Sequence, residues 1–370
     1  MASWKVSPLR TSCLVMPVSL TISGGTVDVT AYNNGLAANK IVVTGGQITA
    51  VSTYTGDDAA NKAIDVPGNT TTYFQIPSTS AFLASTNTTS SYNVGNLNNL
   101  ATYDWVRIGD FVYLHDVELP SGYYLESGNS TATITTVMPS SGEYAYYEDG
   151  VLTLRYYEYS GNSIAIRAFA DLTVESLGGS TINHIISHAG DLTFMGSGVL
   201  DIERNMANDA VNVAGDVYVK SSKITIDGSG GNGIDCKHFY LNGGKVWLDA
   251  YFDGINVDTG LTVNGGALIA TSTATTNDTL YSAINSTATA PTITIKSGLN
   301  HMVGRTASPD DGLSTSFTEG DYDFVAVGDL VMVRNAILTL GDYIRNGNST
   351  PTLSGGADNY AYYSSSNRLI

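Results

Sequence analysis

A short pattern returns again and again between residues 171 and 297, and it limits what this chain can fold into. Successive copies read AVNVAGDVYVKSSKITIDG, GIDCKHFYLNGGKVWLDA and GINVDTGLTVNGGALIATS. Each copy holds three apolar–polar–apolar triplets separated by turns rich in Asp, Asn and Gly, and equivalent positions lie about 21 to 23 residues apart. Because side chains alternate between the two faces of a strand, each triplet predicts a strand with one buried face. Three strands per copy and regular spacing predict the stacked coils of an all-β parallel β-helix, or β-solenoid.

The inward positions of the triplets line up in three columns, one for each strand of a coil. We expect the coils to wind right-handed, because parallel crossover connections almost always do. The first column holds Val211/Val213, Ile234/Cys236 and Ile255/Val257, the second Val217/Val219, Phe239/Leu241 and Leu261/Val263, and the third Ile224/Ile226, Val246/Leu248 and Leu268/Ala270.

A second and much longer repeat is superimposed on the coils. The segment LTISGGTVDVTAYNNG at 20–35 matches FYLNGGKVWLDAYFDG at 239–254, and YDWVRIGDFV at 103–112 matches YDFVAVGDLV at 322–331. The offset stays near 219 residues, which indicates an internal duplication. We therefore predict four segments: an N-terminal cap at 1–17, a first solenoid half-module with loop insertions at 18–154, central coils at 155–237, and a second copy of the half-module at 238–370.

Composition excludes several classes of partner. Of 370 residues, 42% are apolar, which allows a large core, and the net charge of −17 argues against nucleic acid and anionic membranes. No apolar run is long enough to span a bilayer. The two cysteines exclude a disulfide framework, and the alternation predicts Cys236 as a buried free thiol.

The N-terminal segment leaves the cellular location open. Its apolar run of about nine residues after Arg10 shows no convincing export signal. The protein is expected either outside the cell or on the cell surface after trimming of a signal, or in a virion assembled in the cytoplasm. Open solenoid ends expose unpaired strand edges, so we also expect self-association through these ends.

Outward-facing aromatic side chains are the first candidates for a binding site. Tyr218 and Tyr240 should stack on neighbouring coils, and an aromatic row flanked by Asp and Asn suits sugar rings. The alternative is a cross-coil ladder that only stabilises the sheet. The tyrosines at 144–159 are expected to pack at module junctions. The predicted ligand-binding residues are Tyr218, Tyr240, Trp247, Asp249, Tyr251 and Asp253.

Stacked carboxylates and amides are the second candidates. One ladder holds Asp209, Asn232 and Asp253, and the pair Asp227 and Asp249 could bind Ca²⁺, which would relieve the repulsion between the carboxylates. The alternative is that Asn and Asp suit the turns and hydrogen-bond along the stack. No other cofactor is indicated.

Several phrases resemble a known group of proteins. DLTFMGSGVLDI, VNVAGDVYVKSSKITIDG and FDGINVDTGLTVNGGALIAT are similar to the repetitive β-helix proteins of bacterial cell surfaces that are labelled carbohydrate-binding-domain-containing. The resemblance covers about residues 145–297 well and 18–66 in part. It implies a right-handed parallel β-helix, export and a surface role, and it brings no catalytic residues with it.

Three functions follow from these observations. The first is a non-enzymatic surface β-solenoid for adhesion or glycan binding, and the second is a self-assembling structural subunit of a filament, sheath or virion spike. The third is a polysaccharide-cleaving β-helix enzyme, but the Gly-His-Gly and Arg-x-Lys motifs of such enzymes are missing. The sequence therefore predicts a binding protein rather than an enzyme.

Overall fold

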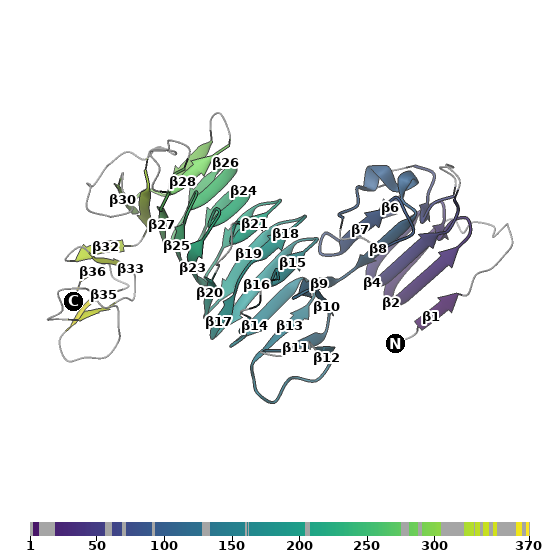
Figure 1. The fold of residues 1–370 in the computed structure, drawn as a ribbon, viewed down its shortest axis with the longest axis horizontal. Coiled ribbons are helices and arrows are strands. Elements are labelled where there is room, and N and C mark those ends of the chain that lie inside the picture. Colours follow the sequence, from purple (N-terminus) through teal and green to yellow (C-terminus); the bar gives the residue numbers. More distant parts are fainter. Residues whose placement is uncertain are drawn as a thin grey trace.

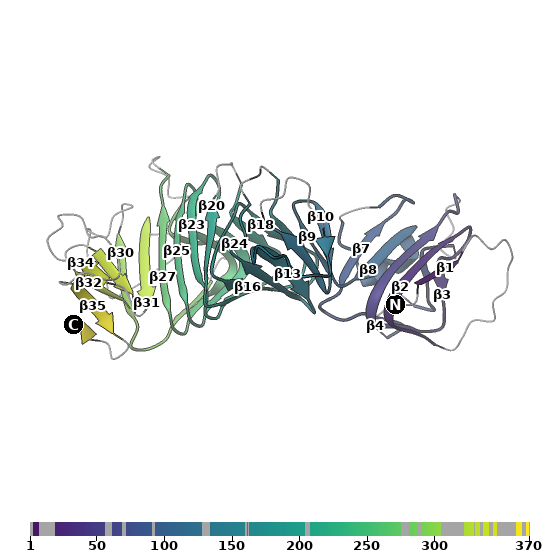
Figure 2. The same cartoon turned by 90° about the horizontal axis from the view of Figure 1, so that it is seen from below.

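The protein is an elongated all-β structure whose coils follow one another along one axis (Figure 1, Figure 2). The computed structural model describes residues 3–6, 19–55, 61–68, 72–90, 93–127, 134–159, 161, 163–203, 208–274, 281–287, 291–304, 322–328, 330–333, 336–339, 343–345, 360–364 and 368–369. Its strands form a β-solenoid arrangement of about 10 turns, which confirms the predicted fold class. The right-handed winding stays a prediction.

Three sheet faces surround the core of the central coils, because each coil contributes three strands. We call the first the amide face: β15 (Ile166–Ala168), β18 (Ile185–Ser187), β21 (Val211–Val213), the first halves of β24 (Ile234–Leu241) and β26 (Ile255–Val263), and β28 (Ile284–Ser286). The tyrosine face holds β16 (Leu172–Leu177), β19 (Leu192–Gly196), β22 (Val217–Val219), the second halves of β24 and β26, and β29 (Thr292–Ile295). The third face holds β17 (Gly179–Ile182), β20 (Val199–Glu203), β23 (Lys223–Ser229), β25 (Lys245–Ala250) and β27 (Ala267–Ser272).

Parallel pairing places the predicted columns in register on all three faces. Val211 pairs with Ile234 and Ile234 with Ile255 on the amide face. The other two columns continue in the same way: Val217–Phe239–Leu261 on the tyrosine face and Ile224–Val246–Leu268 on the third face. These side chains are buried in one continuous hydrophobic cluster, and Cys236 lies in it as a free thiol, as predicted.

Antiparallel strands begin this cluster: the first two extend the amide face beyond β15, and the other four extend the tyrosine face beyond β16. They are β9 (Phe111–Leu114), β10 (Val117–Pro120), β11 (Tyr123–Glu126), β12 (Ile134–Thr135), β13 (Tyr144–Glu148) and β14 (Val151–Arg155). Strand β14 pairs antiparallel with β13 and parallel with β16, so it joins the two kinds of sheet. A tight turn at His115 and Asp116 connects β9 to β10, with φ values of 51° and 64°.

The N-terminal lobe has a separate hydrophobic core. Its elements are β1 (Ser3–Val6), β2 (Leu20–Ala31), β3 (Leu36–Ala37), β4 (Ile41–Ser52), β5 (Ile64–Asp65), β6 (Phe74–Gln75), β7 (Ala81–Ser85), the 3₁₀ helix η1 (Leu97–Thr102) and β8 (Trp105–Gly109). Strands β2 and β4 pair in parallel like two coils, and β8 pairs antiparallel with β4 and β7. The buried side chains of this cluster run from Ile22 to Ile108, whereas those of the coils run from Val112 to Val327.

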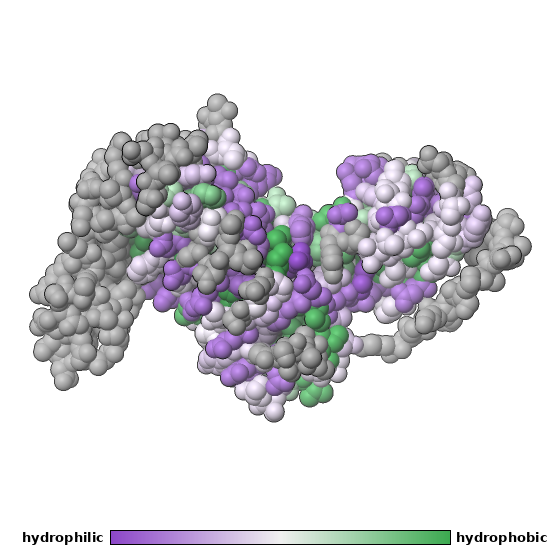
Figure 3. Space-filling model, viewed as in Figure 1, coloured by the Kyte–Doolittle hydropathy of each residue, from purple (hydrophilic) through white to green (hydrophobic). Residues whose placement is uncertain are grey.

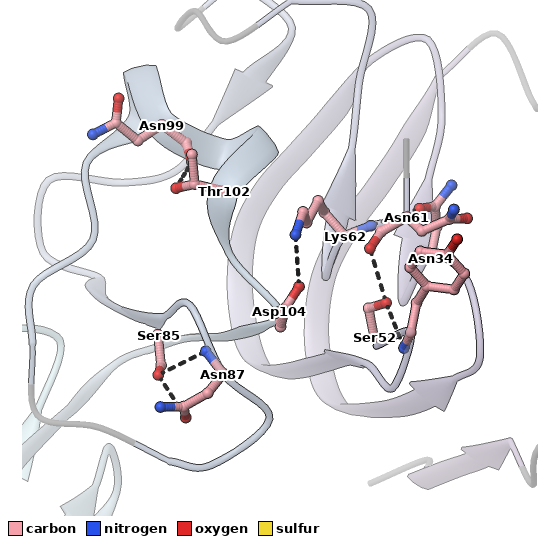
Figure 4. A network of polar contacts seen from close by, with 10 residues as sticks. Asn34, Ser52, Asn61, Lys62, Ser85, Asn87, Asn99, Thr102 and Asp104 are labelled. Carbon is pink, nitrogen blue, oxygen red and sulfur yellow. Dashed lines mark hydrogen bonds and ion pairs between the residues drawn. The ribbon is translucent and has the colours of Figure 1, made fainter. Parts of the chain in front are cut away.

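Polar contacts anchor the loop after β4 to this lobe (Figure 4). Lys62 Nζ lies 3.0 Å from Asp104 Oδ1, and 11% and 15% of the two side chains are exposed. The backbone N–H of Lys62 donates to Asn34 Oδ1 at 2.8 Å, and Ser52 Oγ donates to the Asn61 carbonyl at 3.0 Å. Because these partners come from three different segments, they hold residues 61–62 against both coils of the lobe.

Aromatic side chains join the lobe to the coils. Phe111 and Tyr113 pack edge to face at 5.7 Å between ring centroids, Tyr113 packs on Phe169 at 5.8 Å, and Phe169 stacks on His188 at 5.1 Å. They form a small cluster with Trp105 from β8. The two hydrophobic cores therefore meet near residue 110. The predicted segment boundary between 154 and 155 lies elsewhere, inside the paired strands of the tyrosine face. That boundary stays a prediction about the duplication.

The last strands begin next to β27. They are β30 (Asn300–Gly304), β31 (Phe324–Gly328), β32 (Leu330–Val333), β33 (Ala336–Thr339), β34 (Tyr343–Arg345), β35 (Tyr360–Ser364) and β36 (Arg368–Leu369). Strand β31 pairs antiparallel with β27 and β30. Within the part of the chain that the structure describes, no helix has the length and apolar character needed to cross a membrane.

Candidate functional site

Tyr218 and Tyr240 form a stacked pair of aromatic rings on the outside of the tyrosine face. Their ring centroids are 4.7 Å apart and the ring planes differ by only 3°. The residues are in-register partners on β22 and β24, and both are partly exposed while their neighbours along the strand are buried. The parallel register imposes this stacking, because it places equivalent side chains one strand spacing apart. The predicted stack is therefore present.

Polar groups surround this pair. Tyr218 Oη donates to Asp216 Oδ2 at 3.2 Å, and burial together with Asp216 raises the pKa of Tyr218 to about 12. The imidazole of His238 stacks on Tyr240 at 4.2 Å, and its Nε2 lies 3.0 Å from Thr262 Oγ1. Burial lowers the pKa of His238, so the ring is neutral at pH 7. The surface thus combines three stacked rings with hydroxyl and carboxylate groups beside them.

Trp247 and Asp249 lie on a different face from Tyr218 and Tyr240. Both belong to β25 of the third face, and the turn at Gly243 and Gly244 separates them from Tyr240. Trp247 is 47% exposed, and Asp249 accepts a hydrogen bond from Thr271 Oγ1 at 3.0 Å. The predicted columns agree with this placement, since Tyr240 lies between Phe239 and Leu241 of the second column and Trp247 between Val246 and Leu248 of the third.

Tyr251 occupies the corner that follows β25. It is 47% exposed and packs on Phe252 at 5.2 Å between centroids, and Phe252 stacks on Tyr281 at 4.4 Å. This second aromatic group belongs to the turn between the third face and the amide face.

Asp253 is buried, unlike the other predicted ligand-binding residues. Only 5% of it is exposed, and its carboxylate accepts from the Ser282 N–H at 2.8 Å and from Asn285 Nδ2 at 3.1 Å. Burial raises its pKa. Because both carboxylate oxygens are engaged inside the protein, we leave Asp253 out of the proposed contact surface.

The ladder that contains Asp253 holds the coils together. Asp209 Oδ1 accepts from the Asn232 N–H at 2.8 Å, and Asn232 Oδ1 accepts from the Asp253 N–H at 3.0 Å. The same arrangement recurs at the next corner, where Asp171 accepts from the Asp191 N–H and Asp191 from the Asp216 N–H. Each side chain caps the backbone of the next coil, which is the role that turn geometry and stacking alone predict.

The two carboxylates predicted to bind calcium are not register partners. Asp227 pairs with Glu203, and an irregularity after Ile226 shifts the register before β25. Asp249 pairs with Thr271 instead. Over the described residues, no three His, Cys, Asp or Glu side chains gather closely enough to hold a metal ion. The calcium hypothesis for Asp227 and Asp249 is untested by these contacts and stays a prediction.

A cavity of about 560 Å³ lies between the lobe and the coils. Its lining includes Gln47, Asp110, Ser121, Tyr123 and Asp149. The Asp110 carboxylate accepts from the Tyr147 hydroxyl, and burial raises its pKa. Asp149 begins a tight Asp-Gly hairpin turn with a φ of 48°.

A second outward tyrosine group was not expected from the sequence. Tyr124 stacks on Tyr146 at 4.3 Å with 29° between the rings and meets Tyr144 edge to face at 5.2 Å. By contrast, Tyr147 and Tyr157 are buried, as expected for packing at a junction. The alternation in EYAYYE at 143–148 would have predicted the outward tyrosines, since Ala145 and Tyr147 face inward and Tyr144 and Tyr146 face outward.

Comparison with known proteins fits this architecture, and hydrophilic residues predominate among the described residues on the side shown in Figure 3. No curated protein and no solved structure gives a significant match to the sequence. A family model does match, and it spans residues 168–356, which include most of the coils. The chain belongs to the family described as carbohydrate-binding domain-containing protein.

Proposed function

We propose that the protein is a non-enzymatic, extracellular or surface-exposed β-solenoid that binds glycans and so serves adhesion. One observation carries the proposal: the parallel, stacked rings of Tyr218 and Tyr240 on an outer sheet face of a protein in a carbohydrate-binding family. The C–H faces of sugar rings pack on aromatic rings, and neighbouring polar groups bind the hydroxyls. Asp216, His238 and Thr262 supply such groups here.

Trp247 and Tyr251 are proposed as separate contacts. They are exposed and lie away from the tyrosine face, so a glycan bound to them would occupy a second place on the surface. Asp249 belongs with them as a flanking acceptor, because it lies two residues from each.

A glycan array tests the proposal. We expect hits for the wild type that fall about tenfold or more for Tyr218→Ala/Tyr240→Ala, because the sugar loses its stacking platform. Tyr218→Phe/Tyr240→Phe keeps the rings and should keep most of the signal. Tyr32→Ala is the matched control, since Tyr32 is 61% exposed in the N-terminal lobe.

The same array separates the two surfaces. Trp247→Ala reduces the signal only if the third face also contacts sugar. The absence of hits across a broad array, with correctly folded protein, would contradict glycan binding as a whole.

A second candidate is a self-assembling structural subunit built from duplicated modules. Strand pairing supports the duplication: β8 lies antiparallel between β4 and β7, and β31 lies antiparallel between β27 and β30. Hairpin β9–β10 is followed by the pair β11–β13, and hairpin β32–β33 by the pair β34–β35. Electron microscopy separates the candidates, because fibres or defined oligomers favour assembly.

A further inference from the structure

The two outward tyrosine groups lie on one continuous sheet face. In the sheet order, β11 and β13 are followed by β14, β16, β19, β22 and β24. Figure 1 shows β13, β14, β16 and β19 following one another toward the coils. From β13 to β22 there are four strand spacings of about 4.8 Å, which makes a separation of about 19 Å.

Register defines the outward side chains between the two groups. One row runs through Tyr124, Tyr146, Thr153, Glu175 and Met195. A second row, two residues along each strand, runs through Thr173, Thr193, Tyr218, Tyr240, Thr262 and Thr294. Both rows cross β16 and β19. A path that runs obliquely across these two strands therefore connects the two tyrosine groups over outward-facing side chains.

The side chains along this path are mostly polar. Between the tyrosines stand threonines, Met195 and Glu175, which accepts a hydrogen bond from Thr153 Oγ1 at 3.1 Å. No Lys or Arg belongs to either row, Arg155 lies beside the first row as the register partner of Tyr144, and the protein carries a net charge of −17. An acidic polymer would therefore be repelled, whereas hydroxyl groups would find donors and acceptors.

We infer that the tyrosine face is a track for an extended, uncharged polysaccharide, held at one end by Tyr218 and Tyr240 and at the other by Tyr124 and Tyr146. This inference rests on the proposed function and adds the second anchor and the class of ligand. A polysaccharide that reaches both anchors binds with higher affinity than one that reaches a single anchor, because its binding at the second anchor becomes intramolecular. A short oligosaccharide reaches only one anchor.

Affinity gel electrophoresis provides the test. Soluble β-glucan, xylan and galactomannan are the uncharged probes, and polygalacturonate is the acidic probe. We expect at least one uncharged polymer to retard the wild type, and both Tyr124→Ala/Tyr146→Ala and Tyr218→Ala/Tyr240→Ala to lose most of this retardation. Tyr32→Ala is the control, and Tyr124→Phe/Tyr146→Phe, which keeps the rings, should bind like the wild type even if the Ala variant folds poorly.

Oligosaccharides from the polymer that binds then measure the length of the track. Affinity should rise by roughly 10²-fold once the chain spans about 19 Å. Tyr124→Ala/Tyr146→Ala should remove this rise and reduce the number of sites for the shortest ligands from two to one.

The outcomes separate the inference from the function on which it rests. If only the Tyr218→Ala/Tyr240→Ala variant loses retardation, the track is wrong and glycan binding stands. Retardation by polygalacturonate alone overturns the uncharged class of ligand. If no polymer retards the folded wild type, both the track and the proposed glycan binding fail.

Discussion

At the scale of single residues, His115 at the turn between β9 and β10 is a titratable group held by two tyrosines. It stacks on Tyr159 with 3.5 Å between ring centroids, and a 2.7 Å hydrogen bond joins its Nε2 to Tyr157 Oη. Burial lowers its pKa from 6.5 to about 4, against the opposing effect of Asp116. The ring therefore stays neutral in the folded protein at pH values where it is charged in the unfolded chain.

This pKa shift makes stability depend on pH. His115 takes up a proton at a higher pH in the unfolded chain than in the folded protein, so it lowers the free energy of unfolding as pH falls from 6.5 toward 4. The loss is about 1–3 kcal/mol after allowance for the partial exposure of the ring. Buried carboxyl groups such as Asp253, whose pKa is raised, have the opposite sign. The measurement is therefore the difference in urea unfolding between wild type and His115→Phe at pH 7 and pH 4.5. We expect the wild type to lose stability relative to the variant at pH 4.5, and an unchanged difference would contradict the shift.

At the scale of elements, the turns between the tyrosine face and the third face depend on stacked glycines. Gly244 follows β24 with a φ of 76°, and a Cβ there would lie 2.3 Å from the Ser222 carbonyl oxygen. Gly266 repeats this on the next coil, with a φ of 80° and the Gly244 carbonyl oxygen at 2.5 Å. The close approach of successive coils leaves no room for a side chain.

Two alanine substitutions separate the cost of the clash from the cost of the backbone conformation. Gly298 has a φ of 93°, but no atom lies within 4 Å of the position that a Cβ would take, so Gly298→Ala measures conformation alone, about 1–2 kcal/mol. Gly244→Ala should cost at least about 2 kcal/mol more, because backbone atoms must move. Chemical denaturation measures both. Equal losses for the two variants would show that the coils can separate at the turn without cost.

At the scale of the whole molecule, the separate core of the lobe and the long core of the coils have different consequences. The coils can be extended without changing the packing of their neighbours, as in other repeat proteins. Among the described residues, β28 and β29 end the amide and tyrosine faces, and sheet edges of this kind pair with other chains when they are exposed. Self-association through the solenoid ends therefore stays a prediction.

Light scattering tests this association. We expect an apparent mass that rises with concentration above the 39.0 kDa of one chain. Substituting Thr292→Lys or Thr294→Lys on β29, whose two threonines are outward-facing, should reduce the rise if this strand is the contact, because a charged edge resists pairing. A constant monomer mass over a wide range of concentration would contradict end-to-end assembly.

The repeat in the sequence was sufficient to predict the coils, their three strands and their inward columns. Val211, Ile234 and Ile255 could be placed above one another because side-chain alternation and equal spacing act locally. The stack of Tyr218 on Tyr240 followed from the same register. The antiparallel entry strands were not predicted, because their pairing depends on hairpins whose partners lie outside the repeat.

The sequence by itself determined which residues face the core and which equivalent residues stack, since both depend on the period of the chain. Only the tertiary structure decided which residues outside the repeat share a surface with the coils. Tyr146, distant in sequence, lies on the same sheet as Tyr240 because β13 pairs with β14 and β14 with β16, and the repeat does not encode these pairings. Burial of Asp253 was likewise decided by the coil that covers it, because Ser282 and Asn285 come from the next turn of the solenoid.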